Sequence, residues 1–533
     1  MKQARRQPKK PPPRRPPPRE RKSSLDSFVR LDKSAVIFLI FAFCLTHWLI
    51  RVFIAPVFTI EEADQLLLSQ SLQVGYEARQ PPLLTWLHAL TIGSVGLSAP
   101  AVFALKYLLL FVALTFYYLS ARNVLIRPGV SAAAVAAWAL TFQVGWGMHE
   151  DLLGAVALMA SLSLTLHAFT RILTWRRYRD WVYLGLTIGV GMLTHHLYIV
   201  FPVAMMLGIF LSPFFRDSVN PGRILITVVV AGLIYGPYAI WISTHIGSVG
   251  DAAREYATSW DIDSAWLNRV ANAAGALGRT LLEFTLPLSL FWLMLFWPMW
   301  LPIIYPVFQR RSTDEEPHEM FWRRLLARAM LFATAAYLLG VVLGVQTFKG
   351  YWLLPALFPA PIWMFAHVKR AGDFPIAIRA FAAVVIAFAA LVIAGRFIEW
   401  RLEVRMCDEC RPYAPIRDWA SELRKAGFTE GTIVGADKHL TGNLRGALPR
   451  ARVLDASIPP DALPAAHTNG ACLAVWRNET VMPEALAAYL EDELGAPPHD
   501  MGPEGAIRRN LRLSDDKAAT LYLQFVRPSE ACR

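Results

Sequence analysis

The chain alternates between long runs of apolar residues and short polar connections. A helix needs about 20 apolar residues to cross the hydrocarbon of a bilayer, and on that rule the sequence predicts about eleven spans. Two further apolar segments, 83–97 and 264–280, predict re-entrant or interfacial helices. The predicted spans are residues 34–55, 101–120, 130–148, 151–170, 181–195, 197–212, 222–242, 281–307, 327–346, 351–368 and 375–397.

After Arg396 the hydrophobicity falls, and residues 401–533 predict a small water-soluble α/β domain. An amphipathic segment at 418–427 ends on a glycine and predicts a helix. No glycine-rich phosphate loop occurs in this part of the sequence, so a nucleotide site has no support there. The remaining predicted elements are strands at 432–435, 452–455, 472–476 and 520–526 and a second helix at 440–448.

The composition identifies the class of protein. Hydrophobic residues make up 55% of the 533 residues, charged residues make up 18%, and the mean hydropathy is +0.36. These values are typical of a polytopic membrane protein. The formal net charge of +12 does not indicate nucleic-acid binding, because lysine and arginine gather in the amino-terminal tail and in short loops between apolar runs. That distribution follows the positive-inside rule.

Residues 1–33 are rich in proline, lysine and arginine and predict a disordered cytoplasmic tail. We interpret the tail as a topology signal, with contact to anionic lipid headgroups as the alternative. The first apolar run begins near Ser34 and is long enough to remain as an anchor, so we expect no cleavable signal peptide. Residues 34–400 then form the transmembrane domain, and residues 401–533 lie on the external side.

Four polar places fall on the external face in this orientation. They are Glu61 to Arg79, the turn His149-Glu150-Asp151, the pair His195-His196, and the segment 346–352. The long external segment 243–279 would join them as a lid or a wall, since loops of that length in compact proteins are commonly functional.

Carboxylates in these places are candidates for catalysis. Glu61, Glu62 and Asp64 directly follow the first predicted span, and Asp151 opens the fourth. A carboxylate can accept the proton of an attacking hydroxyl, and a positioned base contributes roughly 10²- to 10⁴-fold to a rate. The structural alternatives are ordinary: interface carboxylates are often solvated, and an acid at a helix start serves as a cap.

The stretch that begins Thr59-Ile-Glu-Glu-Ala63 and closes with Gln80-Pro-Pro-Leu83 resembles the first external loop of the glycosyltransferase C superfamily. The resemblance is to the branch of protein O-mannosyltransferases and lipid A aminoarabinose transferases. It implies a multi-pass enzyme of the bacterial inner membrane whose active site and carboxyl-terminal domain are periplasmic. The implied donor is a polyprenyl-phosphate-linked sugar, and the implied acceptor is lipid A, lipopolysaccharide core, another envelope glycan or a protein.

The resemblance also assigns roles to particular residues. Glu61 and Glu62 match the acidic pair of the family loop, where the first position is usually aspartate, so either glutamate is a candidate for the catalytic role. Asp151 matches the acid of the second external loop. These carboxylates fit an inverting displacement with Glu61 or Asp151 as the base.

A phosphate leaving group requires positive charge or hydrogen-bond donors, for which arginine and lysine are suited. Each candidate on the external side has the alternative of being an interface anchor. The glycine-rich run 185–196 resembles the family's fifth span, with two histidines in place of lysine and an aromatic residue, and 347–355 resembles a late family motif. The candidates are Arg79, Lys106, His195, His196, Lys349, Tyr351 and Trp352.

No cofactor is indicated with certainty. A divalent metal held by the paired histidines with Glu61, Asp151 or His149 stays open, because the spacing does not decide it. For Cys407 and Cys410 a local disulfide is the first interpretation, ahead of a metal or redox site. Cys472 and Cys532 offer a second bridge, and Cys44 falls in a span.

Two other functions compete with the glycosyltransferase. A transporter or flippase would place ionisable residues and broken helices near the bilayer midplane and would often show repeated halves. Here the acids fall at span ends on one face, and the sequence shows no repeat. A catalytically inactive relative that serves as an envelope-assembly scaffold is the third reading, and it predicts that neutralising Glu61 and Asp151 leaves function intact.

Overall fold

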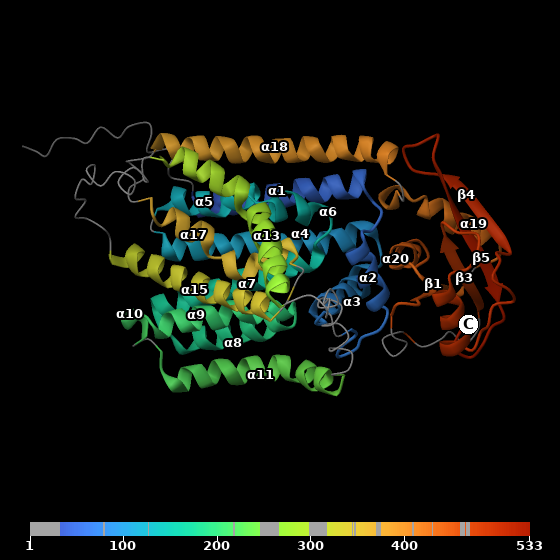
Figure 1. Ribbon diagram of the computed structural model, residues 1–533, viewed down its shortest axis with the longest axis horizontal. Helices are drawn as coiled ribbons and strands as arrows, with labels where there is room; N and C mark the ends of the chain where they lie inside the picture. Colours follow the sequence, from blue (N-terminus) through green and yellow to red (C-terminus); the bar gives the residue numbers. More distant parts are fainter. Residues whose placement is uncertain are drawn as a thin grey trace, which may run out of the picture.

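The fold is a long bundle of helices with a mixed α/β domain at one end (Figure 1). The predicted amino-terminal tail, most of the predicted lid and Arg79 lie outside the described residues. The computed structural model describes residues 32–77, 80–125, 127–216, 219–245, 266–297, 317–343, 345, 348–368, 375–407, 410–428, 430–458, 464 and 470–533.

Six helices in the described part of the chain are long and apolar enough to cross a bilayer. A seventh span is formed if two helical segments, Pro128–Leu140 and Gln143–Glu150, are counted together across the 75° bend between them. The six are α1 (Lys33–Ile54), α4 (Ala99–Val124), α7 (Leu153–Trp175), α11 (Pro221–Thr244), α15 (Pro317–Val342) and α18 (Pro375–Met406).

Shorter or broken helices occupy the other predicted spans apart from 281–307. The segment 351–368 is broken at its prolines into short turns, and 181–195 and 197–212 yield helices of 15 and 11 residues. The prediction of a separate helix at 264–280 is wrong, because α13 (Trp266–Leu295) runs through its end without a break. These elements are α5 (Pro128–Ala136), α6 (Met148–Glu150), α8 (Tyr178–Met192), α9 (Val200–Phe210), α10 (Pro213–Arg216), η6 (Gly350–Leu353), α16 (Leu354–Leu357) and α17 (Ala360–Phe365).

Helix α7 is the centre of the bundle. Of its most apolar window 89% is buried inside the protein, whereas the corresponding share of the other five long helices is 11% to 44%. It packs against α4 on one side and α8 on the other. Most of α7 is therefore enclosed by protein.

The carboxyl-terminal domain is built on a five-stranded sheet with the order β2-β1-β3-β5-β4. β1 pairs in parallel with β2 and β3, whereas β5 runs antiparallel to β3 and β4. Every predicted strand is present, and β4 is an additional strand at the edge. The elements are α19 (Ile416–Lys425), β1 (Gly431–Gly435), α20 (Lys438–Ala447), β2 (Arg452–Asp455), β3 (Ala471–Arg477), α21 (Glu484–Ala488), β4 (Gly505–Asn510) and β5 (Ala518–Val526).

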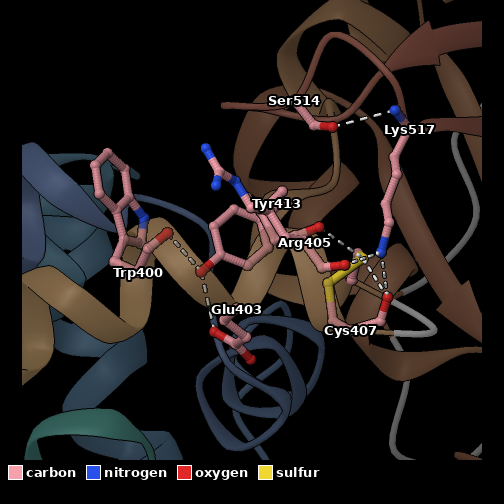
Figure 2. The surroundings of a disulfide bond; sticks show 9 residues. Trp400, Glu403, Arg405, Cys407, Tyr413, Ser514 and Lys517 are labelled. Atoms are coloured by element: carbon pink, nitrogen blue, oxygen red, sulfur yellow. Dashed lines mark hydrogen bonds between the residues drawn. A yellow bond between two sulfur atoms is a disulfide. The ribbon is translucent and has the colours of Figure 1, made fainter.

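The domain joins the bundle directly after α18, and the junction is tightly bonded (Figure 2). Lys517 donates from Nζ to the carbonyls of Arg405 and Cys407 at 2.9 and 3.0 Å, which satisfies carbonyl groups at the end of α18. Tyr413 donates to the carbonyl of Trp400 at 2.9 Å. The two predicted disulfides, Cys407–Cys410 and Cys472–Cys532, are both present.

The domain also packs on the first external loop. This loop contains α2 (Ile60–Leu68), and α3 (Leu83–Val95) follows it as the predicted short apolar helix. Leu67, Leu68 and Tyr76 of the loop belong to the same apolar core as the sheet of the domain. Figure 1 shows α20 lying between α2 and the sheet.

Candidate active site

Helix α2 begins at a capping box. The Thr59 side chain accepts from the backbone N–H of Glu62 at 3.4 Å, and Glu62 Oε2 accepts from the N–H of Thr59 at 3.0 Å. The acidic residues in the first turn also suit the positive end of the helix dipole. The cap therefore fixes the direction in which Glu61 leaves the helix.

The amino terminus of α7 meets this cap. The Thr59 hydroxyl donates a 2.6 Å hydrogen bond to Oδ1 of Asp151, and the backbone N–H of Gly154 donates a 3.0 Å bond to Oε2 of Glu61. Between them Leu152 has φ 51°, a left-handed conformation that costs a residue with a β-carbon roughly 1–2 kcal/mol. Thr59 at the start of α2 thus bonds to Asp151, and Gly154 at the start of α7 bonds to Glu61. The two predicted carboxylates therefore lie side by side.

Glu62 has a different environment. It is 1% exposed, and its Oε2 accepts from Arg51 at 2.7 Å while its Oε1 lies 3.6 Å from Lys106 Nζ. Arg51 also donates to the carbonyl of Val57 at 2.8 Å and stacks over Phe103. These contacts indicate a structural role for Glu62, which is the buried counter-ion of Arg51 and Lys106.

The electrostatics of the two adjacent carboxylates favour a proton acceptor. Burial, reinforced by the charge of Asp151, raises the pKa of Glu61 to about 7, although the Gly154 bond and the charges of Lys106 and Lys349 oppose the shift. Burial also raises the pKa of Asp151, against the charge of Lys106 and the Thr59 bond. A carboxylate that titrates near 7 is matched to general-base catalysis at neutral pH.

Several predicted phosphate-binding residues reach the same site. Lys349 lies within electrostatic range of Glu61 and of His195, and the ring of Tyr351 meets that of His195 edge to face at 5.8 Å. Lys106 is buried against Glu62.

The other two predicted residues point elsewhere. The ring of His196 stacks on Tyr238 of α11 at 6.5 Å. Trp352 packs into the core of the bundle, where its carbonyl accepts from the Tyr337 hydroxyl. Arg79 has no described position.

A cavity of about 440 Å³ opens beside these groups. Thr59 and Asp151 line it, as do Arg396 and two stacked imidazoles, His47 and His149, whose ring centroids are 3.6 Å apart. Lining residues come from α1, α18 and the carboxyl-terminal domain, so the cavity lies where the bundle meets that domain.

The histidines do not gather with the acids into a metal-binding group. Among the described residues no cluster of three or more His, Cys, Asp or Glu side chains is arranged to hold an ion. Arg51, Arg396 and Lys438 are charged neighbours of the site that the sequence analysis did not select. A pattern did mark Arg51, which is a single arginine in the last turn of an apolar span.

Comparison with known proteins finds a family model and relatives of similar length. Residues 79–241 match the family model for dolichyl-phosphate-mannose-protein mannosyltransferase. The lipopolysaccharide core galacturonosyltransferases RgtA and RgtB of Rhizobium johnstonii are 26% and 27% identical to the chain. The alignments cover 87% and 90% of this chain and 92% and 94% of those proteins.

A solved structure shares the fold across the whole length. ArnT from Cupriavidus metallidurans, bound to undecaprenyl phosphate, has a TM-score of 0.55 at 12% identity, with 91% of this chain and 97% of that chain covered. Its apo structure gives a TM-score of 0.52. The fold and these relatives define a multi-pass membrane glycosyltransferase. These matches confirm the resemblance to the glycosyltransferase C superfamily that residues 59–83 indicated.

Proposed function

We propose that the chain transfers a sugar from a polyprenyl-phosphate carrier to the lipopolysaccharide core at the periplasmic face of the bacterial inner membrane. The observation that carries the proposal is the pairing of Glu61 and Asp151, which two separate hydrogen bonds hold together at the start of the central helix. Two lysines, Lys106 and Lys349, act on the same carboxylate.

The proposed reaction is a single displacement. An acceptor hydroxyl attacks the anomeric carbon of the donor sugar, the carbon–oxygen bond to the phosphate breaks, and the hydroxyl proton passes to Glu61. Attack opposite the leaving group inverts the anomeric centre. Polyprenyl phosphate leaves with the electron pair of the broken bond, and positive charge stabilises it.

The residues take different parts in this scheme. Glu61 is the base, because its pKa of about 7 lets it accept a proton at neutral pH. Asp151 holds Thr59 and raises the pKa of Glu61. Lys349, with His195 and Tyr351, forms the side that receives the donor phosphate. Glu62, Lys106 and Arg51 fix the loop. His196 and Trp352 support the neighbouring helices.

Relatives indicate which substrates to try first. The two Rhizobium proteins are named as core galacturonosyltransferases, and they align with about nine-tenths of this chain. The structural neighbour was solved with undecaprenyl phosphate. We therefore propose galacturonic acid on a polyprenyl phosphate as the donor and a core sugar as the acceptor.

The test is mass spectrometry of lipopolysaccharide from cells that lack the gene and from cells that carry it again in wild-type or variant form. Glu61→Gln and Asp151→Asn are compared with Glu491→Gln, an exposed glutamate of the carboxyl-terminal domain, at matched protein levels. We expect a uronic acid to disappear from the core on deletion and to return with the wild type and Glu491→Gln. Restoration of the wild-type core by both acid variants would overturn the catalytic assignment and favour a scaffold or a transporter.

A further inference from the structure

A second pocket, of about 370 Å³, adjoins the main cavity. The two share Ile60, Arg411 and His439 in their linings. Apart from Ile60, every lining residue of the second pocket belongs to the carboxyl-terminal domain, among them Asp437 and Arg477. We call it the Arg477 pocket. Its lining includes Ile60, which precedes Glu61 in α2.

The guanidinium of Arg477 is buried but only partly bonded. The side chain is 6% exposed, and its Nε donates to Oδ2 of Asp437 at 2.7 Å. Its Nη2 is buried and meets no hydrogen-bond partner in the described part of the chain. Because a buried donor without a partner is unfavourable, a ligand that accepts a hydrogen bond from Nη2 would be stabilised here.

His439 is a second buried side chain in the lining of this pocket. It is 3% exposed, and its Nδ1 has no hydrogen-bond partner among the described atoms. Burial and the charges of Arg477 and Arg411 lower the pKa of His439 to about 4, although Asp437 opposes them. The charges of Arg477 and Arg411 therefore act on His439 in the same direction as its burial.

Lys438 does not provide that potential. Its ammonium lies 2.8 Å from Asp64 and 3.0 Å from Glu77, so both contacts are directed toward the first external loop. Among the described residues that line the pocket, Asp437 supplies the one carboxylate.

We propose that the Arg477 pocket binds a carboxylate or phosphate group of the saccharide acceptor. The proposal rests on the proposed function, since it names the part of the acceptor that this enzyme would hold. A guanidinium binds either anion through its planar fork of donors. The water-side position of the pocket suits a sugar substituent rather than a polyprenyl chain, and the pocket adjoins the main cavity, which Thr59 and Asp151 line.

The test measures steady-state transfer by the full-length protein in lipid nanodiscs. The acceptors are purified core oligosaccharide, the same material after dephosphorylation, and the same material after reduction of its carboxyl groups. We expect Arg477→Gln to raise the acceptor KM about tenfold or more, as expected for loss of a hydrogen bond to a charged group. The donor KM and kcat should stay within about twofold, and Arg477→Lys should recover part of the loss. The matched control is Arg424→Gln, an exposed arginine of α19 in the same domain.

The acceptors test the pocket without any mutation. We expect one of the two neutralised acceptors to raise the wild-type KM to the level of Arg477→Gln, which identifies the anion as phosphate or carboxylate, while inorganic phosphate alone competes weakly. Equal KM values for all three acceptors with the wild-type protein would overturn the proposal, as would an acceptor KM in folded Arg477→Gln equal to that of Arg424→Gln. Absence of any transfer to core by the wild type would instead contradict the proposed function.

Discussion

The Thr59 hydroxyl donates to Asp151 across 92 residues of sequence, and this bond joins the cap of α2 to the start of α7. The same threonine oxygen accepts from Glu62. The Thr59 side chain therefore positions both carboxylates of the proposed reaction. It bonds to Asp151 directly, and it caps the helical turn that carries Glu61.

Replacing Thr59 tests this relationship. Thr59→Val keeps the shape of the side chain but removes both hydrogen bonds, so we expect the free energy of unfolding to fall by about 1 kcal/mol and transfer to fall at least tenfold. Thr59→Ser keeps the hydroxyl and should retain most of the activity. Thermal unfolding in detergent and transfer rates at matched concentrations check both. Equal rates for the valine and serine variants would show that the bond does not matter.

The pH dependence of transfer follows from Glu61. Its pKa is raised from 4.5 to about 7, so the basic form appears as the pH rises through about 7, and kcat/KM should rise with it and then level off. The same shift makes ionisation of Glu61 cost stability, a loss that begins above 4.5 and is complete above about 7. A pH–rate profile that breaks near 4.5 would assign the base to a different group.

Glu62→Gln should act on stability. It removes the carboxylate that faces buried Arg51 and Lys106, and breaking a buried pair in this way costs about 3–5 kcal/mol. The control is Glu422→Gln, whose pairs with Lys425 and Arg509 are at the surface and contribute little.

Half-lives of the folded protein in detergent at a fixed elevated temperature distinguish the two variants. We expect a much shorter half-life for Glu62→Gln than for Glu422→Gln. If the half-lives are the same, the ion pair at Glu62 does not stabilise the loop.

The contact between α20 and α2 should affect sugar transfer, because α2 carries Glu61. A β-carbon on Gly442 would lie 2.4 Å from the Ala63 carbonyl oxygen, so Gly442→Ala must push α20 away from the helix that carries Glu61. We expect transfer to fall at least tenfold. Gly278→Ala in α13, where nothing lies within 4 Å, is the matched control and should be neutral or slightly stabilising. Wild-type activity of Gly442→Ala would show that the domain contact is dispensable.

Much of the fold could be predicted from the sequence because membrane spans and buried strands are apolar. Strand β4 was missed because its side chains are mostly exposed and include Arg508 and Arg509, so it lacks the apolar alternation of a strand. Breaks within spans were also missed. The bend near Phe142 occurs in an apolar run, where hydropathy carries no information on backbone direction.

The candidate site was predictable in its residue types but not in their pairing. Glu61 and Glu62 are neighbours with the same side chain, yet the capping box turns one toward α7 and the other toward Arg51. That difference arises from helix phase and from a partner in another span. Lys438 could not be assigned because its partners, Asp64 and Glu77, are more than three hundred residues away in the sequence.

The core that buries Leu67 and Tyr76 is completed by strands at the far end of the chain, including β5. The loop that carries Glu61 therefore reaches its final packing only after β5 has been synthesised. A nascent chain that stopped before β5 would contain every proposed catalytic side chain and still lack the surface that holds them. Synthesis of β5 is therefore required before the proposed catalytic side chains are held in place.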